Sequence, residues 1–215
     1  MQPWQPDAVL AAFASPPGYR LEHARAADVP ELIARLREWY PDIVVGAESV
    51  HLDPAFYARD VYLAHGDAER PVLALVARPT ASTEMVAALT LSRDPHARTV
   101  SGRLGAVAPA HRASALGLLG PRLLEAFGRA SGAELATYFA TLKSRHQQVI
   151  AERLGFEPVG IVPGNDRDMV APGEVRRVYE ILYAKVLVEP AQVLTPAPEH
   201  LTAKTRALYM HLFGA

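Results

Sequence analysis

The chain has 215 residues, of which 50% are hydrophobic and 21% are charged, and its formal net charge is −1. This length and composition predict a globular domain with a substantial core. The near-neutral charge argues against the basic surface that nucleic-acid binding requires, and no apolar run approaches the roughly 20 residues that span a membrane. Because no positively charged segment precedes the short apolar stretch at the N-terminus, we expect no signal peptide and a cytoplasmic location.

Cysteine is absent from the chain, which excludes disulfides, thiolate metal sites and a cysteine nucleophile. The eight histidines show neither His-x-x-x-His nor His-x-His spacing, so we expect no metal site. Arginine supplies most of the basic residues, and its planar guanidinium suits phosphate recognition.

In chain order, residues 1–18 predict a short N-terminal helical extension that ends at a Pro-Pro-Gly break. Tyr19–Ala24 predicts the first strand. Asp28 is the expected N-cap of a helix that runs from near Pro30 to Tyr40. Pro54–Ala64 predicts a second amphipathic helix.

Three strands joined by short turns follow, which favours an antiparallel meander. They are expected at Pro71–Arg78, Glu84–Ser92 and Thr99–Val107. The next segment predicts a helix that ends at Ser131-Gly132 and carries a stripe of apolar side chains. This stripe consists of Leu116, Leu119, Leu123 and Phe127.

The last part of the chain predicts a strand at Glu134–Thr141 and a helix at Ser144–Leu154 that is stopped by Gly155. Phe156–Val162 and Val175–Leu187 are expected to form a closing pair of strands around a long loop, and residues 188–215 a proline-rich linker and a helix near Glu199–Phe213. The order of elements predicts the fold class α/β (α+β). We expect a single domain at 19–187, with a central mixed, mostly antiparallel sheet flanked by helices.

The most informative stretch is 99–117, TVSGRLGAVAPAHRASALG. Its strand ends at Val107, Pro109 stops the strand, and His111-Arg112 then opens a segment of small residues. A turn of this composition can direct several backbone N–H groups at one anion, backed by an arginine and the positive end of a helix. The stretch therefore predicts a site for the pyrophosphate of a nucleotide-like cofactor.

Three segments in the same order resemble the GNAT superfamily of acyl-CoA-dependent N-acyltransferases. They are ARAADVPELIARL, then VAPAHRASALG at the place of the family's Arg/Gln-x-x-Gly-x-Gly/Ala loop, and finally SRHQQVIAERLGFEPVGIVPG. The resemblance covers about residues 19–187 and implies a GNAT-like fold. It also implies acetyl-CoA or another acyl-CoA as co-substrate, and direct transfer of the acyl group to an amine on a small molecule or a protein.

The resemblance further implies that backbone groups of Ala106 and Val107, near a bulge at the end of a strand, pair with the pantetheine amides. Arg112 falls on the Arg/Gln position of the loop. The other expected cofactor contacts are Ala113, Ser114, Ala115, Leu116 and Gly117 of the loop, and Ser144 of the later helix.

Two features depart from the family's loop. Ala115 stands where the first glycine is expected, and Pro121 stands in the following helix, which it would bend. Alternatively, that helix begins at Gly120-Pro121, which would move the positive end of its dipole away from the loop.

The family's usual catalytic residues are missing, because Arg103 stands at the position of the Glu and Ala151 at that of the Tyr. We consider three substitutes, each with a structural alternative. Glu84 could act as the base or simply be solvated at the end of a strand. Tyr138 could act as the acid or fill the core. His146 has a reference pKa that suits acid–base work, and the alternative is a position at the surface or a cap of its helix.

Several hypotheses about function follow. The first is an N-acyltransferase of the N-acetyltransferase type with an unknown acceptor, and the alternative is a catalytically inactive acyl-CoA-binding sensor or interaction module. A third is a structural protein whose terminal helix docks on a partner or on a second copy; a homodimer would also suit an enzyme. The charged segment PGNDRDMVAPGEVRR could form one wall of an acceptor pocket or a solvated hairpin loop.

Overall fold

The sheet is built around β3 (Val72–Pro79), in which every residue except the last is buried. A strand that is covered on both faces shows a continuous apolar run instead of an alternation. β1 (Tyr19–His23) and β4 (Ala87–Asp94) pair antiparallel with β3, and β5 (Thr99–Val107) pairs antiparallel with β4. These pairings confirm the predicted meander.

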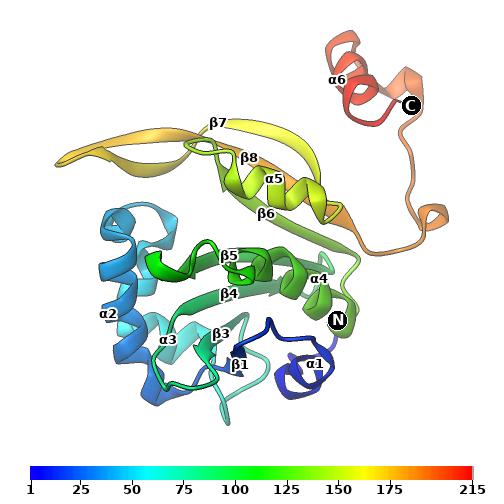
Figure 1. Ribbon diagram of the computed structural model, residues 1–215. Coiled ribbons are helices and arrows are strands. Elements are labelled where there is room, and N and C mark those ends of the chain that lie inside the picture. Colours follow the sequence, from blue (N-terminus) through cyan, green and yellow to red (C-terminus); the bar gives the residue numbers. More distant parts are fainter. Residues whose placement is uncertain (215) are drawn as a thin grey trace.

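The second part of the sheet begins with β6 (Leu135–Thr141), which is parallel to β5. β8 (Glu174–Val186) and β7 (Glu157–Ala171) complete it as an antiparallel pair. The computed structural model describes residues 1–214, and in these the strand order is β1-β3-β4-β5-β6-β8-β7, with the short β2 (Val61–Tyr62) parallel to β3 (Figure 1). The predicted mixed, mostly antiparallel sheet is confirmed.

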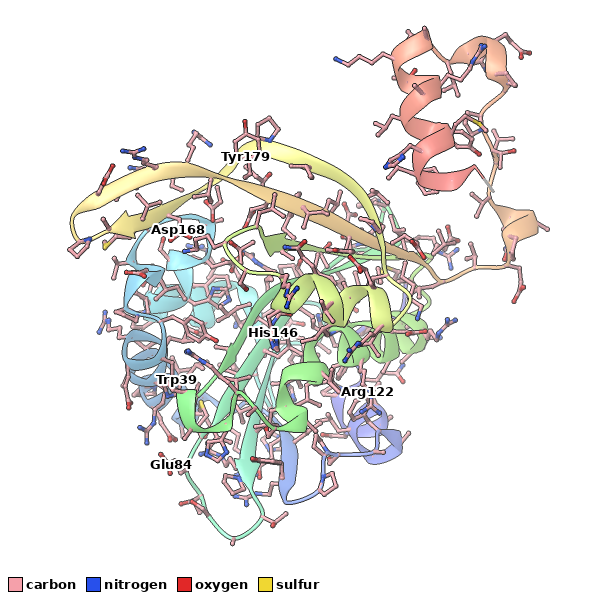
Figure 2. All side chains as sticks on the ribbon, turned by 45° about the horizontal axis from the view of Figure 1, so that its top comes forward. Trp39, Glu84, Arg122, His146, Asp168 and Tyr179 are labelled. Carbon is pink, nitrogen blue, oxygen red and sulfur yellow. The ribbon has the colours of Figure 1, made fainter. Side chains whose placement is uncertain are left out.

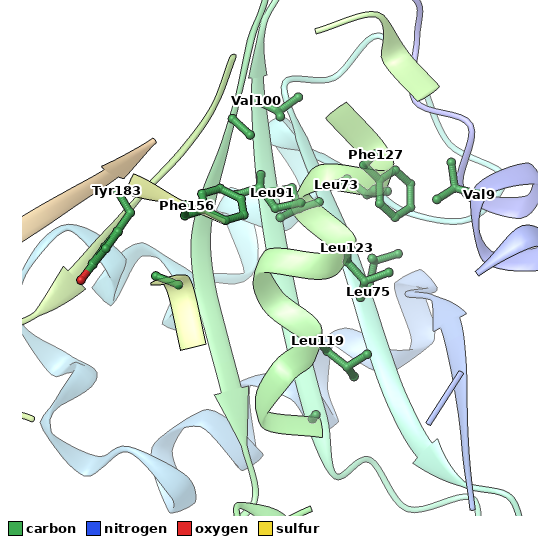
Figure 3. Close-up of a cluster of buried hydrophobic side chains, with 14 of the residues drawn as sticks. Val9, Leu73, Leu75, Leu91, Val100, Leu119, Leu123, Phe127, Phe156 and Tyr183 are labelled. Carbon is green, nitrogen blue, oxygen red and sulfur yellow. The ribbon is translucent and has the colours of Figure 1, made fainter. Parts of the chain in front are cut away.

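Helices cover both faces of the sheet. On one face, α2 (Val29–Trp39) and α3 (Pro54–Asp60) pack against alternate residues of β3, namely Val72, Ala74 and Val76. On the other face, α1 (Pro6–Ala12), α4 (Leu119–Ser131) and α5 (His146–Arg153) pack in the cluster that contains Leu73, Leu75 and Ala77. Figure 3 shows Leu119 and Leu123 of α4 beside the strand that carries Leu73 and Leu75.

The two ends of the chain differ. Trp4 and Val9 are buried in the same cluster as α4, and the ring of Trp4 meets Phe127 edge-on at 6.0 Å. The predicted N-terminal extension is therefore part of the core. At the other end, α6 (Ala203–Phe213) follows an extended connection and stands apart from the sheet (Figure 1). No helix within residues 1–214 combines the length and apolarity needed to cross a membrane.

Three details of the predicted helices are corrected. The helix predicted at Pro54–Ala64 ends at Asp60, because Val61 and Tyr62 pair with β3. Asp28 precedes α2 as predicted, but its carboxylate bonds to Arg25 N at 2.8 Å and to Arg78 Nη2 at 2.7 Å and makes no bond to the helix. Pro121 does not bend a helix, since α4 begins at Leu119 and the first turn needs no N–H from it.

The long loop predicted between the last two strands is also wrong. β7 continues to Ala171 and β8 begins at Glu174, and Gly173 adopts the positive φ of +75° in the turn between them. We call the paired residues Asp166–Ala171 and Glu174–Val178 the arm. Most of its side chains are exposed or half-buried, so its sequence lacks the apolar alternation by which strands are recognised.

Candidate functional site

The sheet opens between β5 and β6. The two strands pair through Thr99–Gly102 and Leu135–Tyr138 and then separate. The register of β5 against β4 also shifts here: Leu104 lies opposite Thr90 and Gly102 opposite Leu91, so that Arg103 is the extra residue of a bulge. A cavity of about 460 Å³ fills the opening, with residues 103–107 on one side and 139–141 on the other.

The end of β5 directs alternate backbone groups into this opening. Ala106 lies opposite Ala88, and Ala108 N donates to Val86 O, so the even-numbered residues bond to β4. The predicted pairing of Ala106 with pantetheine is therefore corrected, because its N–H and C=O face β4. Val107 faces the opening, and so does Gly105, which the sequence analysis missed although strict alternation along the strand identifies it.

Val107 is already held by side chains. Its N–H donates to Tyr40 Oη at 3.4 Å, and its carbonyl accepts from Arg112 Nε at 3.1 Å. Arg112 Nη2 donates to Trp39 O at 2.9 Å, and the guanidinium lies 4.8 Å from the centre of the Tyr40 ring. Arg112 thus ties the loop after β5 to the end of α2, while its side chain lines the rim of the cavity.

The loop that was predicted to bind a pyrophosphate borders the cavity, since Leu116 and Gly117 line it. Two of its N–H groups are engaged by Ser114, however. Ser114 Oγ accepts from Leu116 N at 3.2 Å, and Ser114 O accepts from Gly117 N at 3.3 Å. Ala113 and Ala115 are exposed. The loop ends in a short turn, Ala115–Leu118, which precedes α4. The first turn of α4 contains Pro121 and so offers one donor fewer.

The start of α5 forms the opposite rim. Ser144 and His146 line the cavity. A Cβ added to Gly117 would lie 3.6 Å from His146 Nε2, so the loop and the imidazole face one another. Figure 2 shows His146 at the beginning of α5. Two predicted cofactor contacts of the loop and two predicted residues of the later helix are therefore brought to one mouth.

Tyr138 lies at the inner end of the opening, opposite Gly102 where β5 and β6 last pair. Its ring stacks on Tyr183 at 5.8 Å and meets Phe156 edge-on at 5.4 Å. Its hydroxyl is buried and has no hydrogen-bond partner among residues 1–214. Burial, helped by the neighbouring Tyr183 and Glu152, raises the pKa of Tyr138, so the phenol keeps its proton at neutral pH.

Glu84 does not lie in the site. β4 begins at Ala87, and Glu84 belongs to the preceding connection, where its carboxylate pairs with Arg35 Nη2 at 3.0 Å. The cavity lining does not include it, and Figure 2 shows it near the lower end of the view, below His146. The prediction that Glu84 opens a strand beside the cleft is therefore wrong, because the strand starts three residues later.

Sequence reasoning missed a buried chain of polar groups behind the bulge. Leu104 N donates to Thr90 Oγ1 at 3.2 Å, and that hydroxyl lies 2.8 Å from Nε2 of the fully buried His51. Glu48 Oε2 lies 3.0 Å from His51 Nδ1. Glu48 and His51 occupy a short 3-10 turn, in which residues three apart lie on one side. The spacing of three residues between Glu48 and His51 is visible in the sequence, but it brings the two side chains together only when the segment forms this turn.

Glu48 also fixes Arg103 on the wall of the cavity. Arg103 Nε lies 3.5 Å from Glu48 Oε1, and the guanidinium lies 5.6 Å from the centre of the Phe56 ring. Burial alone would raise the pKa of Glu48, but His51 and Arg103 outweigh it and lower the pKa. Arg103 thus stands where the GNAT superfamily often carries a glutamate, and its guanidinium is held by the carboxylate of Glu48.

The base of the arm adds further carboxylates near this pair. Asp166 accepts from Ala47 N at 2.9 Å, Asp168 pairs with Lys143, and Glu180 accepts from Asn165 at 2.6 Å. Burial and the charges of Asp166, Asp168 and Glu48 raise the pKa of Glu180. The arm therefore contacts the 3-10 turn Ala47–Leu52 and is more than a solvated loop. Within residues 1–214, no group of three or more His, Asp or Glu side chains is arranged to hold a metal ion.

No family model and no curated protein matches this sequence. Solved structures do match its fold. A mutant of the spermidine N-acetyltransferase SpeG from Vibrio cholerae aligns with a TM-score of 0.61 and 12% identity, covering 79% of this chain and 94% of the other. The ribosomal-protein-S5-alanine acetyltransferase from Vibrio fischeri aligns with a TM-score of 0.61 and 8% identity, covering 81% and 95%. An aminoglycoside 6'-acetyltransferase type Ii aligns with a TM-score of 0.56 and 14% identity, covering 79% and 97%. The chain therefore has the fold of the GNAT acetyltransferases.

Proposed function

We propose that this protein binds an acyl-CoA in the opening between β5 and β6 and transfers the acyl group to an amine. One observation carries the proposal: the two strands separate after Gly102, and the resulting cavity meets the loop after β5 at its rim. The names of the structural neighbours, which are acetyltransferases acting on different amines, support the reaction class.

In this proposal the cofactor completes the sheet. The free backbone groups of Gly105 pair with the pantetheine amides as a neighbouring strand would. The pyrophosphate lies between Gly117 and His146, next to the remaining N–H groups of Arg112, and Ser144 lies beside the pantetheine arm. Ala113 and Ala115 contribute backbone N–H groups from the exposed side of the loop.

The transfer needs one bond to form and one to break. The neutral amine attacks the thioester carbonyl, the new C–N bond forms and the C–S bond breaks, while the amine loses its proton to solvent. The departing sulfur takes a proton, for which we propose the hydroxyl of Tyr138 as the source, since it is protonated and has no other partner. We assign His146 to the phosphates because it faces Gly117.

A second function is favoured by one specific observation. Arg103 occupies the position of the expected base and is paired with Glu48, and Ala151 at the position of the expected acid is fully buried. A protein that binds acyl-CoA as a sensor or interaction module, without transfer, fits these two residues. The predicted homodimer and the cytoplasmic location stay predictions.

Titration calorimetry with CoA and acetyl-CoA tests the binding. We expect heat of binding, and a loss of about tenfold in affinity for His146→Ala, because a hydrogen bond to a charged phosphate is removed. No heat with either compound contradicts both functions.

A panel of amines, with release of free thiol as the readout, then separates the enzyme from the sensor. If Tyr138 is the proton donor, Tyr138→Phe lowers kcat by about 10²-fold or more without loss of stability, because the removed hydroxyl has no partner. Tyr183→Phe is the matched control, since that hydroxyl donates to Glu152 at 2.9 Å. Unchanged turnover in Tyr138→Phe removes Tyr138 from the mechanism. If none of the amines causes release of free thiol, the protein is the sensor and not the enzyme.

A further inference from the structure

The cavity extends well beyond the opening between β5 and β6. Its lining includes residues of β4, β3 and β1, which are the three strands on the far side of β5 from the opening. Neighbouring strands lie about 4.8 Å apart, so β1 is about 14 Å from β5. A pantetheine arm between β5 and β6 needs none of this space.

The register explains why space remains there. Leu21, Ala77, Ala87 and Val107 lie opposite one another across the four strands. Two of these four side chains end at Cβ, and Gly105 in the next row has no side chain. The surface of the sheet that faces the beginning of α4 therefore carries several short side chains.

The helical side of the cavity is formed by the loop and the first turns of α4. Gly117 and Gly120 line it, together with Leu116, Leu119 and Leu123. A Cβ added to Gly120 and a Cβ added to Gly105 would each lie 3.9 Å from the same atom, Leu89 Cδ1. Leu89 Cδ1 thus lies between β5 and the start of α4, with a glycine on each side of it.

The deeper walls are aliphatic and buried. Leu75, Ala77, Ala87, Leu119 and Leu123 are each at most 6% exposed. Walls of this kind offer a ligand no hydrogen-bond partner, so the part that enters must be apolar. It must also be attached to something that starts in the opening, because both parts form one cavity.

We propose that the transferred group is a fatty acyl chain longer than acetyl, held between α4 and strands β4, β3 and β1. This inference rests on the proposed function, since the chain enters as the thioester of CoA. The transfer step is the one given above, with the C–S bond broken, the C–N bond formed and the thiolate protonated. The acyl chain leaves as part of the amide product.

The test is titration calorimetry with CoA, acetyl-CoA, hexanoyl-CoA and octanoyl-CoA. Burial of each methylene is worth about fourfold in affinity, so we expect a stepwise gain of that order from acetyl-CoA to octanoyl-CoA. If CoA and acetyl-CoA bind but octanoyl-CoA binds no tighter, this inference is overturned and the proposed function stands. If none of the four binds, the proposed function itself fails.

Two variants of one strand locate the chain. Ala77→Leu fills the deeper part and is expected to lower the affinity for octanoyl-CoA at least tenfold while leaving that for acetyl-CoA unchanged. Ala74→Leu is the matched control, because Ala74 is just as buried on the opposite face of β3 and does not line the cavity.

If Ala77→Leu does not fold, Leu21→Phe on the edge strand β1 replaces it, since Leu21 is only partly buried. Equal effects of the variant and its control on octanoyl-CoA would overturn the placement.

Discussion

The two strands β3 and β7 belong to one sheet but bury their residues very differently. β3 is covered by α2 and α3 on one face and by α4 on the other, and its residues from Val72 to Arg78 are all buried. β7 is an edge strand whose residues are exposed or half-buried along its whole length. The opening between β5 and β6 lies at the boundary between these two regions. The opening therefore lies beside the buried part of the sheet and apart from the arm, none of whose residues lines the cavity.

The largest expected effect separates the two regions directly. Leu73→Ala removes a fully buried side chain of β3 and is expected to lower the free energy of unfolding by about 2–5 kcal/mol. Val170→Ala in the arm, where the side chain is 43% exposed, is expected to change it by less than about 0.5 kcal/mol. Urea unfolding measures both. Similar losses in the two variants would contradict the inference that the buried strand β3 contributes more to stability than the arm does.

A smaller loss is expected at the bulge. Thr90→Val leaves Leu104 N and His51 Nε2 without the hydroxyl that now joins them, which is expected to cost about 1–3 kcal/mol. Thr90→Ser keeps the hydroxyl and serves as the control in the same unfolding experiment. If valine and serine behave alike, the hydroxyl does not hold the bulge.

Two carboxylates, one on each side of the opening between β5 and β6, are expected to contribute to the free energy of unfolding with opposite signs. Glu48 has a pKa below its ordinary value of 4.5, so its ionised form stabilises the fold above pH 4.5, and this contribution is lost as the pH falls through the folded-state pKa. Glu180 has a pKa above 4.5, so its ionised form destabilises the fold at neutral pH, and protonation removes the penalty as the pH falls.

Glu48→Gln should therefore be less stable than the wild type at pH 7, and Glu180→Gln more stable. Both differences should shrink when urea unfolding is repeated below pH 4.5. Differences of the same sign at pH 7 would show that the two environments are not opposed in this way.

The smallest effect concerns the contact of the arm with the 3-10 turn Ala47–Leu52. Asp166→Ala removes the carboxylate that accepts from Ala47 N at 2.9 and 3.1 Å. We expect faster amide exchange at Ala47 and a loss of at most about 1 kcal/mol in global stability, because both groups are exposed. Asp168→Ala is the control, since Asp168 pairs with Lys143 instead. Unchanged exchange at Ala47 would show that the arm does not rest on this bond.

Much of the first region could be predicted from the sequence, because its signals are local. VLALVA at the start of β3 is an uninterrupted apolar run, and Gly132 and Gly155 follow helices as predicted, each with a φ of +72°. The arm could not be predicted, because its strands are held by backbone bonds while their side chains face solvent, so the sequence carries charges instead of an alternation.

The candidate site was predictable where one segment supplies several groups. Arg112, Gly117 and His146 all lie at the mouth of the cavity. Glu84 was misplaced because a shift of three residues in the start of β4 moves it to another part of the surface. The Glu48–His51–Thr90 chain was missed because it joins a turn to a strand some 40 residues away, and no local pattern records that contact. The extended cavity arises from the register of four strands, which the sequence does not display.

The central claim is that acyl-CoA binds in the opening between β5 and β6. Hydrogen–deuterium exchange, measured by mass spectrometry with and without CoA, tests it most directly. The account predicts slower exchange in the segments 103–107, 112–120 and 139–147, and no change in the arm or in α6. Unchanged exchange in all three segments at saturating CoA, or protection confined to other parts of the chain, would contradict it.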